Sequence, residues 1–300
     1  GGRRLFGQIL SGSNESEFEH MEKKYRVGLI GVGSIAHIAH LPILAARTDV
    51  EMVGAFAEHI ESVQRTQESY AIQNAVHNMD ELLNLGLDCA FVLSPKTVHA
   101  EQVVRLLEAG VDVFCEKPMG MTLKEAYSMA DAAARTGKKL MIAFNRRYAP
   151  VYRKAKEVYG QMSPDVLIAQ KNRPASEYRA TLENAIHMVD ILRYFCGECV
   201  KVDACSKFTD PLYETLTTAQ LQFENGSVAM LVADRASGQW VETLEMHGHN
   251  KSVLVNCPDT ITVTDNEQSH TTSMTPLAYG WAKVVDKMGF TQEVDHFFDC

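Results

Sequence analysis

The chain has 300 residues, 46% of them hydrophobic and 22% charged, which excludes wholesale disorder and suggests about two domains. The 29 Lys and Arg residues against 38 Asp and Glu residues give a formal charge of −9, which argues against nucleic acid as a partner. No apolar run reaches the roughly 20 residues that span a bilayer, and no secretory signal is recognisable, so we expect no membrane partner and a cytoplasmic location.

The first half of the chain alternates strand and helix patterns. Residues 1–20 are rich in Gly, Ser and Glu without any period, so we expect a leader or disordered tail, with the native start at Met21. Beyond it, strands are predicted at 25–31, 50–56, 88–94, 111–116 and 139–144, and helices at 34–46, 60–71, 98–110 and 122–137. Short apolar strands that alternate with helices predict an α/β fold with a doubly wound parallel (Rossmann) sheet for residues 21–148.

After Pro150 the pattern changes to longer alternating strands with few helices. Helices are predicted at 151–159 and 182–196, and strands at 165–173, 201–208, 216–235, 241–248, 251–256 and 259–266. The pair Asn225-Gly226 predicts a hairpin turn within one of these runs. We therefore expect residues 149–300 to form an α+β domain with a large open, mostly antiparallel sheet. Residues 297–300 are expected to start another helix, so a truncated C-terminus is expected.

A glycine-rich turn follows the first predicted strand. The run from Gly31 to Ala36 reads GxGxxA, and it also opens the first predicted helix. Gly31 suits the tight turn, Gly33 leaves room for a pyrophosphate, and the backbone at Ser34 and Ile35 faces the phosphates at the positive end of the helix. These residues predict a dinucleotide site, against the alternative of a purely structural glycine turn.

The end of the second predicted strand bears on the choice of dinucleotide. A carboxylate at this place would bind the 2′-hydroxyl of NAD, and here Ala57 is followed by Glu58. If Glu58 turns inward NAD is favoured, whereas Ala57 in that position would tolerate the 2′-phosphate of NADP, with His59 nearby. The sequence leaves both cofactors open.

Three later segments resemble the motifs of one enzyme family. They are SPKTVH at 94–99, AGVDVFCEKP at 109–118 and NRRYAP at 145–150. They are similar to the TPxxxH loop, the AGKHV and EKP motifs and the QRRFxP stretch of the Gfo/Idh/MocA oxidoreductases, and the chain is most similar to the MviM-like members. The resemblance implies that Ser94, Pro95, His99 and Glu116 contact the cofactor.

The same resemblance points to the chemistry of Lys117. It implies that Lys117 lies beside the nicotinamide and the substrate, and that the bond from Lys117 to Pro118 is cis. An ammonium at this position can donate a hydrogen bond to a substrate hydroxyl or carbonyl oxygen, and its pKa falls on desolvation. A surface turn is the structural alternative for a Lys-Pro pair.

One helix of the second half carries three polar residues at helical spacing. Glu183, His187 and Asp190 are separated by four and three residues, so we expect them on one face. A solvated polar stripe with one histidine is the alternative. The family often shows DxxxHxxD here, which implies that His187 and Glu183 take part in proton transfer. Asp190, together with Arg147 and Asn145, is expected to contact the substrate.

The resemblance therefore implies an NAD(P)-dependent oxidoreductase that moves hydride between nicotinamide and a hydroxyl of a sugar, cyclitol or related polyol. His187 would take the hydroxyl proton, Lys117 would stabilise the oxyanion, and Glu183 would orient His187 and favour its charged form. The alternative is a non-catalytic dinucleotide-binding regulatory protein on the same fold. By analogy we expect a homodimer or homotetramer.

Two further motifs have a weaker claim to function. Cys196 and Cys199 form a CxxC pair, but the pair is predicted to end a helix rather than to open one, and no second pair of zinc ligands is in view. The run His247-Gly248-His249 lacks partner ligands, so a strand-end turn is favoured and no metal is expected.

Overall fold

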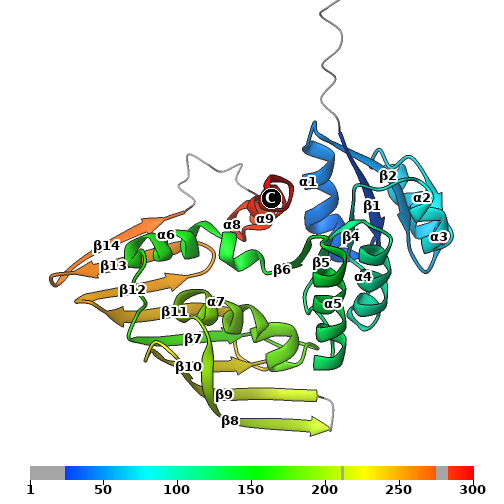
Figure 1. Ribbon diagram of the computed structural model, residues 1–300. Helices are drawn as coiled ribbons and strands as arrows, with labels where there is room; N and C mark the ends of the chain where they lie inside the picture. Colours follow the sequence, from blue (N-terminus) through cyan, green and yellow to red (C-terminus); the bar gives the residue numbers. More distant parts are fainter. Residues whose placement is uncertain (1–23, 211–212, 275–282) are drawn as a thin grey trace, which may run out of the picture.

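The computed structural model describes residues 24–210, 213–274 and 283–300 (Figure 1). The leader predicted at 1–20 and the start predicted at Met21 lie outside these residues. Within the described ranges, no helix is both long and apolar enough to cross a membrane.

A parallel sheet forms the first half, as predicted. Its order is β3-β2-β1-β4-β5-β6, and every neighbouring pair is parallel. The strands are β1 (Tyr25–Ile30), β2 (Val50–Phe56), β3 (Ala75–Val76), β4 (Cys89–Val92), β5 (Asp112–Glu116) and β6 (Leu140–Ala143). Successive side chains of β1, Leu29 and Ile30, are both buried and pack into different layers of core, because the sheet is covered on both faces. The two-residue strand β3 was too short to leave a pattern in the sequence.

Helices cover both faces of this sheet. One layer of core receives side chains from η1 (Ala36–His40), α1 (Leu41–Ala46), α2 (Ile60–Gln67) and α9 (Phe290–Asp299). The other receives them from α3 (Met79–Leu83), α4 (His99–Glu108) and α5 (Leu123–Thr136). Thr122 caps α5 and Gly137 ends it, with Gly137 in the left-handed region at a φ of 67°.

The helix α9 departs from the predicted division of the chain. Val294, Phe297 and Phe298 of α9 are buried in the core layer that contains Phe91 of β4. The chain therefore returns to the first sheet after completing the second, although the sequence pattern assigned 149–300 to one unit (Figure 1). Residues 297–300, expected to begin a helix, lie at the end of α9.

The second sheet has eight strands and is mostly antiparallel, as predicted. Its order is β14-β13-β12-β11-β7-β10-β9-β8, and only β7 and β10 run parallel as neighbours among the described residues. Its strands are β7 (Val166–Asn172), β8 (Cys199–Asp210), β9 (Tyr213–Phe223), β10 (Val228–Asp234), β11 (Val241–Gly248), β12 (Lys251–Asn256), β13 (Thr260–Asp265) and β14 (Gln268–Ser273). The predicted turn at Asn225-Gly226 joins β9 to β10, and Gly226 has a φ of 89°. The sequence reading missed β14, whose side chains are all exposed and show no apolar alternation.

Helices pack on one face of the second sheet. These are α6 (Pro150–Tyr159), η4 (Ala180–Ala185) and α7 (Ile186–Cys196), which share one core with the inner side chains of the sheet. The helix α7 lies against β7 of the second sheet and against the turn at 145–148 that follows β6. The short elements η2 (Lys96–Val98), η3 (Asn145–Tyr148) and α8 (Val284–Lys287) complete the fold. This arrangement brings η4 and α7 next to the loops at the carboxyl ends of the first sheet.

Candidate active site

The first of two adjoining cavities lies at the carboxyl ends of β1, β2 and β4. It has a volume of about 840 Å³, and it contains most of the residues predicted to bind a dinucleotide. Those that line it are Gly31, Gly33, Ser34, Ile35, Ala57, Glu58, Ser94 and Pro95. Ligands of open α/β sheets bind at this edge, so the position and volume fit a dinucleotide.

The two glycines of the GxGxxA turn serve different needs. Gly31 has a φ of 89°, and a Cβ there would lie 2.7 Å from the backbone nitrogen of Ser94, so the fold itself requires glycine. At Gly33 a Cβ would meet no atom within 4 Å. The open space at Gly33 lies where the motif places a pyrophosphate, so this residue fits the cofactor rather than the packing of the protein.

The second cavity has a volume of about 580 Å³ and lies between the two sheets. It shares Ile35, Ser94, Pro95 and Thr97 with the first, so the two cavities adjoin, and together they are called the cleft. The polar side chains that line it come from both halves of the chain: Lys96, His99, Glu116, Lys117, Asn145, Arg146, Arg173, Tyr178, Glu183, His187 and Trp240.

Lys117 enters the second cavity from the loop after β5. The bond from Lys117 to Pro118 is cis, as the resemblance implied. Its ammonium lies 3.4 Å from the backbone carbonyl oxygen of Glu183 in η4, to which it donates a hydrogen bond. Burial lowers the pKa of Lys117; the carboxylate of Glu116 opposes this shift, and Arg173 and Arg146 add to it. The ammonium therefore lies at the boundary of the two halves and faces the space where they meet.

His187 of α7 lines the same cavity. Its side chain is buried, and its Nδ1 has no hydrogen-bond partner among the residues that the structure describes. Burial lowers the pKa of this imidazole well below the usual 6.5, and the positive charges of Arg146, Lys171 and Lys117 lower it further. His187 is consequently neutral near neutral pH, the state in which it can accept a proton.

Glu183 does not orient His187, contrary to the prediction. Its carboxylate pairs with Lys96, and it accepts hydrogen bonds from the backbone N–H of Arg179 at 2.7 Å and from the side chain of Arg179 at 3.2 Å. Burial opposes the ionisation of Glu183, but Lys96 and Arg179 outweigh it and lower its pKa. The carboxylate is engaged by these cations, and the low pKa of His187 contradicts the expectation that Glu183 favours the charged imidazole.

The predicted substrate residues separate into two places. Asn145 lines the second cavity, but Arg147 and Asp190 do not. Arg147 instead forms a bidentate ion pair with Asp190, in which its Nη2 and Nε donate to the two carboxylate oxygens at 2.6 and 2.7 Å. The pair lines a separate surface hollow of about 570 Å³. In a 3₁₀ turn such as η3, neighbouring side chains point about 120° apart, so Arg146 reaches the cavity while Arg147 points away.

The helix carrying His187 explains the position of Asp190. Two residues three apart on an α-helix differ by about 60° around the axis, and here this difference turns Asp190 toward Arg147. Glu183 lies in η4, a π-helical turn, so its phase relative to His187 also differs from that of a regular helix. The three residues therefore do not form a single functional face.

Arg146 belongs to a buried charged cluster under the cavity floor. Its guanidinium donates to both carboxylate oxygens of Glu242 in β11, at 2.5 and 2.9 Å, and Lys171 of β7 pairs with the same carboxylate. Burial opposes ionisation of Glu242, yet Arg146 and Lys171 hold its pKa well below the usual value. The paired charges fix Arg146 in place.

The motif residues Glu116 and His99 are held by internal bonds. Glu116 lies 2.8 Å from the Nε2 of His40, and its other oxygen accepts from the backbone N–H of Lys117. The ring nitrogens of His99 each lie 2.9 Å from a backbone oxygen, one of Pro118 and one of Ser94. His99 is 1% exposed, so it positions the two loops that border the cleft rather than presenting a free side chain to it.

Sequence reasoning missed several residues that line the second cavity. Lys96, Arg146, Arg173, Tyr178 and Trp240 are among them. Arg146 stood next to two predicted residues, but nothing local distinguished it from Arg147. Arg173, Tyr178 and Trp240 come from loops beside β7 and β11, whose meeting with the first half depends on the assembled fold.

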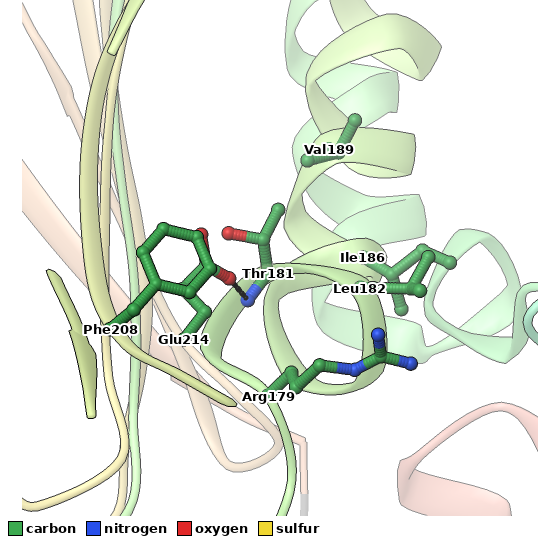
Figure 2. A pocket seen from close by; sticks show the side chains of 7 residues that line it. All are labelled: Arg179, Thr181, Leu182, Ile186, Val189, Phe208 and Glu214. Carbon is green, nitrogen blue, oxygen red and sulfur yellow. Dashed lines mark hydrogen bonds between the residues drawn. The ribbon is translucent and has the colours of Figure 1, made fainter. Parts of the chain in front are cut away.

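A separate apolar hollow of about 450 Å³ lies near this cleft (Figure 2). Figure 2 shows Phe208 and Glu214 facing Thr181, and the backbone N–H of Thr181 donates to Glu214 at 2.7 Å. The lining includes Arg179 but neither a lysine nor a histidine. This hollow therefore lacks the groups that make the second cavity a candidate for proton transfer.

The remaining motifs lie apart from the cleft. Cys196 and Cys199 are free thiols at the end of α7, where Gly197 has a φ of 82°, as predicted for a helix end. His247 contacts Ser252 and Glu245 of its own sheet, and His249 contacts the backbone oxygen of Ser163. Across the described ranges, no group of three or more His, Cys, Asp or Glu is arranged to hold a metal.

Comparison with known proteins assigns the family. One family model, described as an oxidoreductase family with an NAD-binding Rossmann fold, matches residues 25–144, and a second, described as the GFO/IDH/MocA C-terminal domain, matches residues 153–254. The chain belongs to the Gfo/Idh/MocA oxidoreductase family. The family predicted from the three sequence motifs is thus confirmed, and with it a dinucleotide-binding oxidoreductase fold.

Individual Gfo/Idh/MocA relatives extend this comparison. YceM of Salmonella typhimurium is 28% identical over 288 residues, covering 92% of this chain and 89% of its own. The D-glucoside 3-dehydrogenase of Escherichia coli is 34% identical over 125 residues, covering 41% of this chain and 36% of its own. The crystal structure of the dehydrogenase MviM from Clostridium difficile has a TM-score of 0.83 and 24% identity, and the match covers 93% of this chain and 91% of that one. At that identity, the last likeness concerns the fold.

Proposed function

We propose that this Gfo/Idh/MocA protein transfers hydride between a nicotinamide dinucleotide, NAD or NADP, and a hydroxyl-bearing carbon of a sugar, cyclitol or related polyol. The observation that carries the proposal is the meeting of Lys117 and His187 in one cavity that adjoins the cavity of the GxGxxA turn. A relative that acts on a glucoside supports the substrate class.

The residues of the cleft divide the work of the reaction. Gly31, Gly33 and Ser34 would hold the dinucleotide, which when bound accepts or donates the hydride. In the direction of oxidation, the neutral imidazole of His187 accepts the hydroxyl proton of the substrate. The ammonium of Lys117 donates a hydrogen bond to the same oxygen and stabilises the negative charge that develops on it.

Two features of the site favour this division. The ammonium of Lys117 donates one hydrogen bond, to a backbone oxygen, and no carboxylate of the described residues is bonded to it. His187 lines the cavity, and no described residue bonds its Nδ1, so no other group competes for the imidazole at that atom. Glu183 does not contact the reacting atoms in this scheme. Its carboxylate pairs with Lys96 and Arg179, and its backbone oxygen accepts the hydrogen bond of Lys117.

The test is a screen of polyols for cofactor reduction, followed by assays of Lys117→Met and His187→Ala. We expect both variants to lose turnover while dinucleotide binding, measured by quenching of protein fluorescence, is retained. The matched controls are Lys124→Met and His77→Ala, because both side chains are exposed and lie outside the cleft. Turnover that survives in both cleft variants would refute the proposal, and binding without turnover of any polyol would favour the regulatory alternative.

A further inference from the structure

Arg173 enters the second cavity from a firmly held stretch of backbone. It follows β7 directly, its backbone N–H donates to the oxygen of Asp234 at 2.8 Å, and its carbonyl accepts from the N–H of Ser237 at 3.1 Å. Because both of its peptide groups are bonded to the segment after β10, the side chain starts from a fixed position. The backbone that carries this cavity-lining side chain is therefore fixed by hydrogen bonds at the end of the sheet.

Aromatic rings hold this guanidinium, and none of the described carboxylates is bonded to it. Its central carbon lies 4.1 Å from the ring centre of Trp240 and 5.6 Å from that of Tyr178. The Nε of Arg173 is buried without a hydrogen-bond partner, and the side chain makes no ion pair with any residue in the described ranges. The guanidinium of Arg173 therefore lines the cavity without a carboxylate bonded to it, which leaves its charge available to an anionic ligand.

The other charges of the cavity are already paired. The carboxylates that line it are Glu116, which bonds His40, and Glu183, which bonds Lys96 and Arg179. Arg146 is bonded to Glu242. Two lining cations are left without a carboxylate: Lys117, which serves the reacting oxygen in the proposed function, and Arg173, which that function does not use.

We propose that the substrate of this cleft is an anionic sugar or cyclitol derivative, whose carboxylate or phosphate group is bound by Arg173 while Lys117 and His187 flank the carbon that reacts. The proposal rests on the proposed function and narrows its substrate class. A planar guanidinium offers two parallel N–H donors that match two oxygens of either anion. Trp240 is about half exposed (46%) and lines the cavity, so its ring can cover an apolar face of the sugar.

The experiment measures binding to the full chain by calorimetry in the presence of NADH or NADPH. The probes are matched neutral and anionic compounds: glucose, glucuronate and a hexose phosphate, and inositol beside an inositol phosphate. In at least one set, we expect the anionic member to bind about tenfold or more tightly than its neutral partner. The carboxylate and phosphate arms then show which anion the site takes.

Variants assign the preference to Arg173. In Arg173→Met we expect the preference for the anion to fall to about twofold or less, while Arg173→Lys retains part of it because the charge remains but the planar fork is lost. Arg135→Met is the matched control, since Arg135 is exposed and pairs with Glu108 on the outer helices of the first half. Thermal denaturation verifies that each variant is folded.

The outcomes separate this inference from the function beneath it. Equal binding of neutral and anionic members in every set, no binding of any anionic member, or a preference that survives in Arg173→Met would overturn the inference. An Arg173-dependent preference with no cofactor reduction by any compound would keep the anion site at Arg173 and remove the dehydrogenase function. Turnover of neutral polyols without an anion preference would do the reverse.

Discussion

The ammonium of Lys117 donates its hydrogen bond to the main-chain oxygen of Glu183 and not to its carboxylate. The contact joins the loop after β5 to η4, so a residue of the first half is held against the second half by the backbone itself. A substitution of the Glu183 side chain leaves this contact in place, whereas a substitution of Lys117 removes it.

Substituting the side chain of Glu183 should affect catalysis less than substituting Lys117. We expect Glu183→Gln to lower kcat by less than about tenfold, because the backbone oxygen remains, and Lys117→Met to lower it by about 10²–10⁴-fold, because oxyanion stabilisation is lost. Steady-state kinetics with the best polyol of the screen measures both. Equal losses in the two variants would mean that the Glu183 carboxylate has a direct catalytic role.

The pH dependence of kcat/KM for oxidation should report the buried imidazole of His187. Its folded pKa is depressed, so the neutral base persists as the pH falls through the usual value of 6.5, and the rate should decline only below that value. The measurement is a pH profile in the wild type and of the residual turnover of His187→Ala, in which this acid limb should disappear. A limb that begins above pH 6.5, or that survives the substitution, would assign the base elsewhere.

The two glycines of the cofactor turn should respond differently to a single added methyl group. Gly33→Ala should fold normally and bind the dinucleotide at least about tenfold more weakly, since its Cβ meets only the space of the cleft. Gly31→Ala should lower the melting temperature, because its Cβ would collide with the backbone of Leu93 and Ser94 and its φ is positive. Calorimetric titration and thermal denaturation measure the two effects. Normal cofactor affinity in Gly33→Ala would place the pyrophosphate elsewhere.

Removal of the Glu242 carboxylate should destabilise the fold. Glu242→Gln leaves the charge of Arg146 buried without its counter-ion, which costs about 3–5 kcal/mol near neutral pH, while Lys171, whose pKa burial already lowers to about 7, sheds its proton. The folded pKa of Glu242 is depressed below its usual 4.5, so its contribution is present above that pH and is lost as the pH falls below it. Urea denaturation of wild type and variant at neutral and acidic pH checks this: the difference in unfolding free energy should shrink in acid, and a constant difference would contradict the ionic origin.

The Arg147–Asp190 ion pair should be dispensable for substrate binding. Asp190→Asn should leave the KM of the substrate within about twofold of the wild type, because neither partner lines the second cavity. The pair should contribute at most about 1 kcal/mol to stability, as is usual for a pair with an exposed partner. Kinetics and denaturation of this variant are sufficient, and a large rise in KM would restore Asp190 to the substrate site.

The sequence by itself indicated the parallel sheet, the GxGxxA turn, the family and the meeting of Lys117 and His187, which line the same cavity. Each is written in consecutive residues: apolar strands of 4–7 residues between helices, two glycines after β1, and Glu116-Lys117-Pro118 after β5. Such patterns are local because hydrogen bonding and steric limits within one element produce them.

Only the tertiary structure decided which charged groups face the cleft and which face away. Arg146 and Arg147 are chemically identical neighbours, but successive side chains in η3 point in different directions. Arg146 therefore pairs with Glu242 and Arg147 pairs with Asp190. Arg173 and Trp240 meet because β7 and β11 are paired in one register, and α9, which follows the second sheet in the chain, packs on the first sheet. These placements depend on rotations and contacts between distant segments, which no run of adjacent residues encodes.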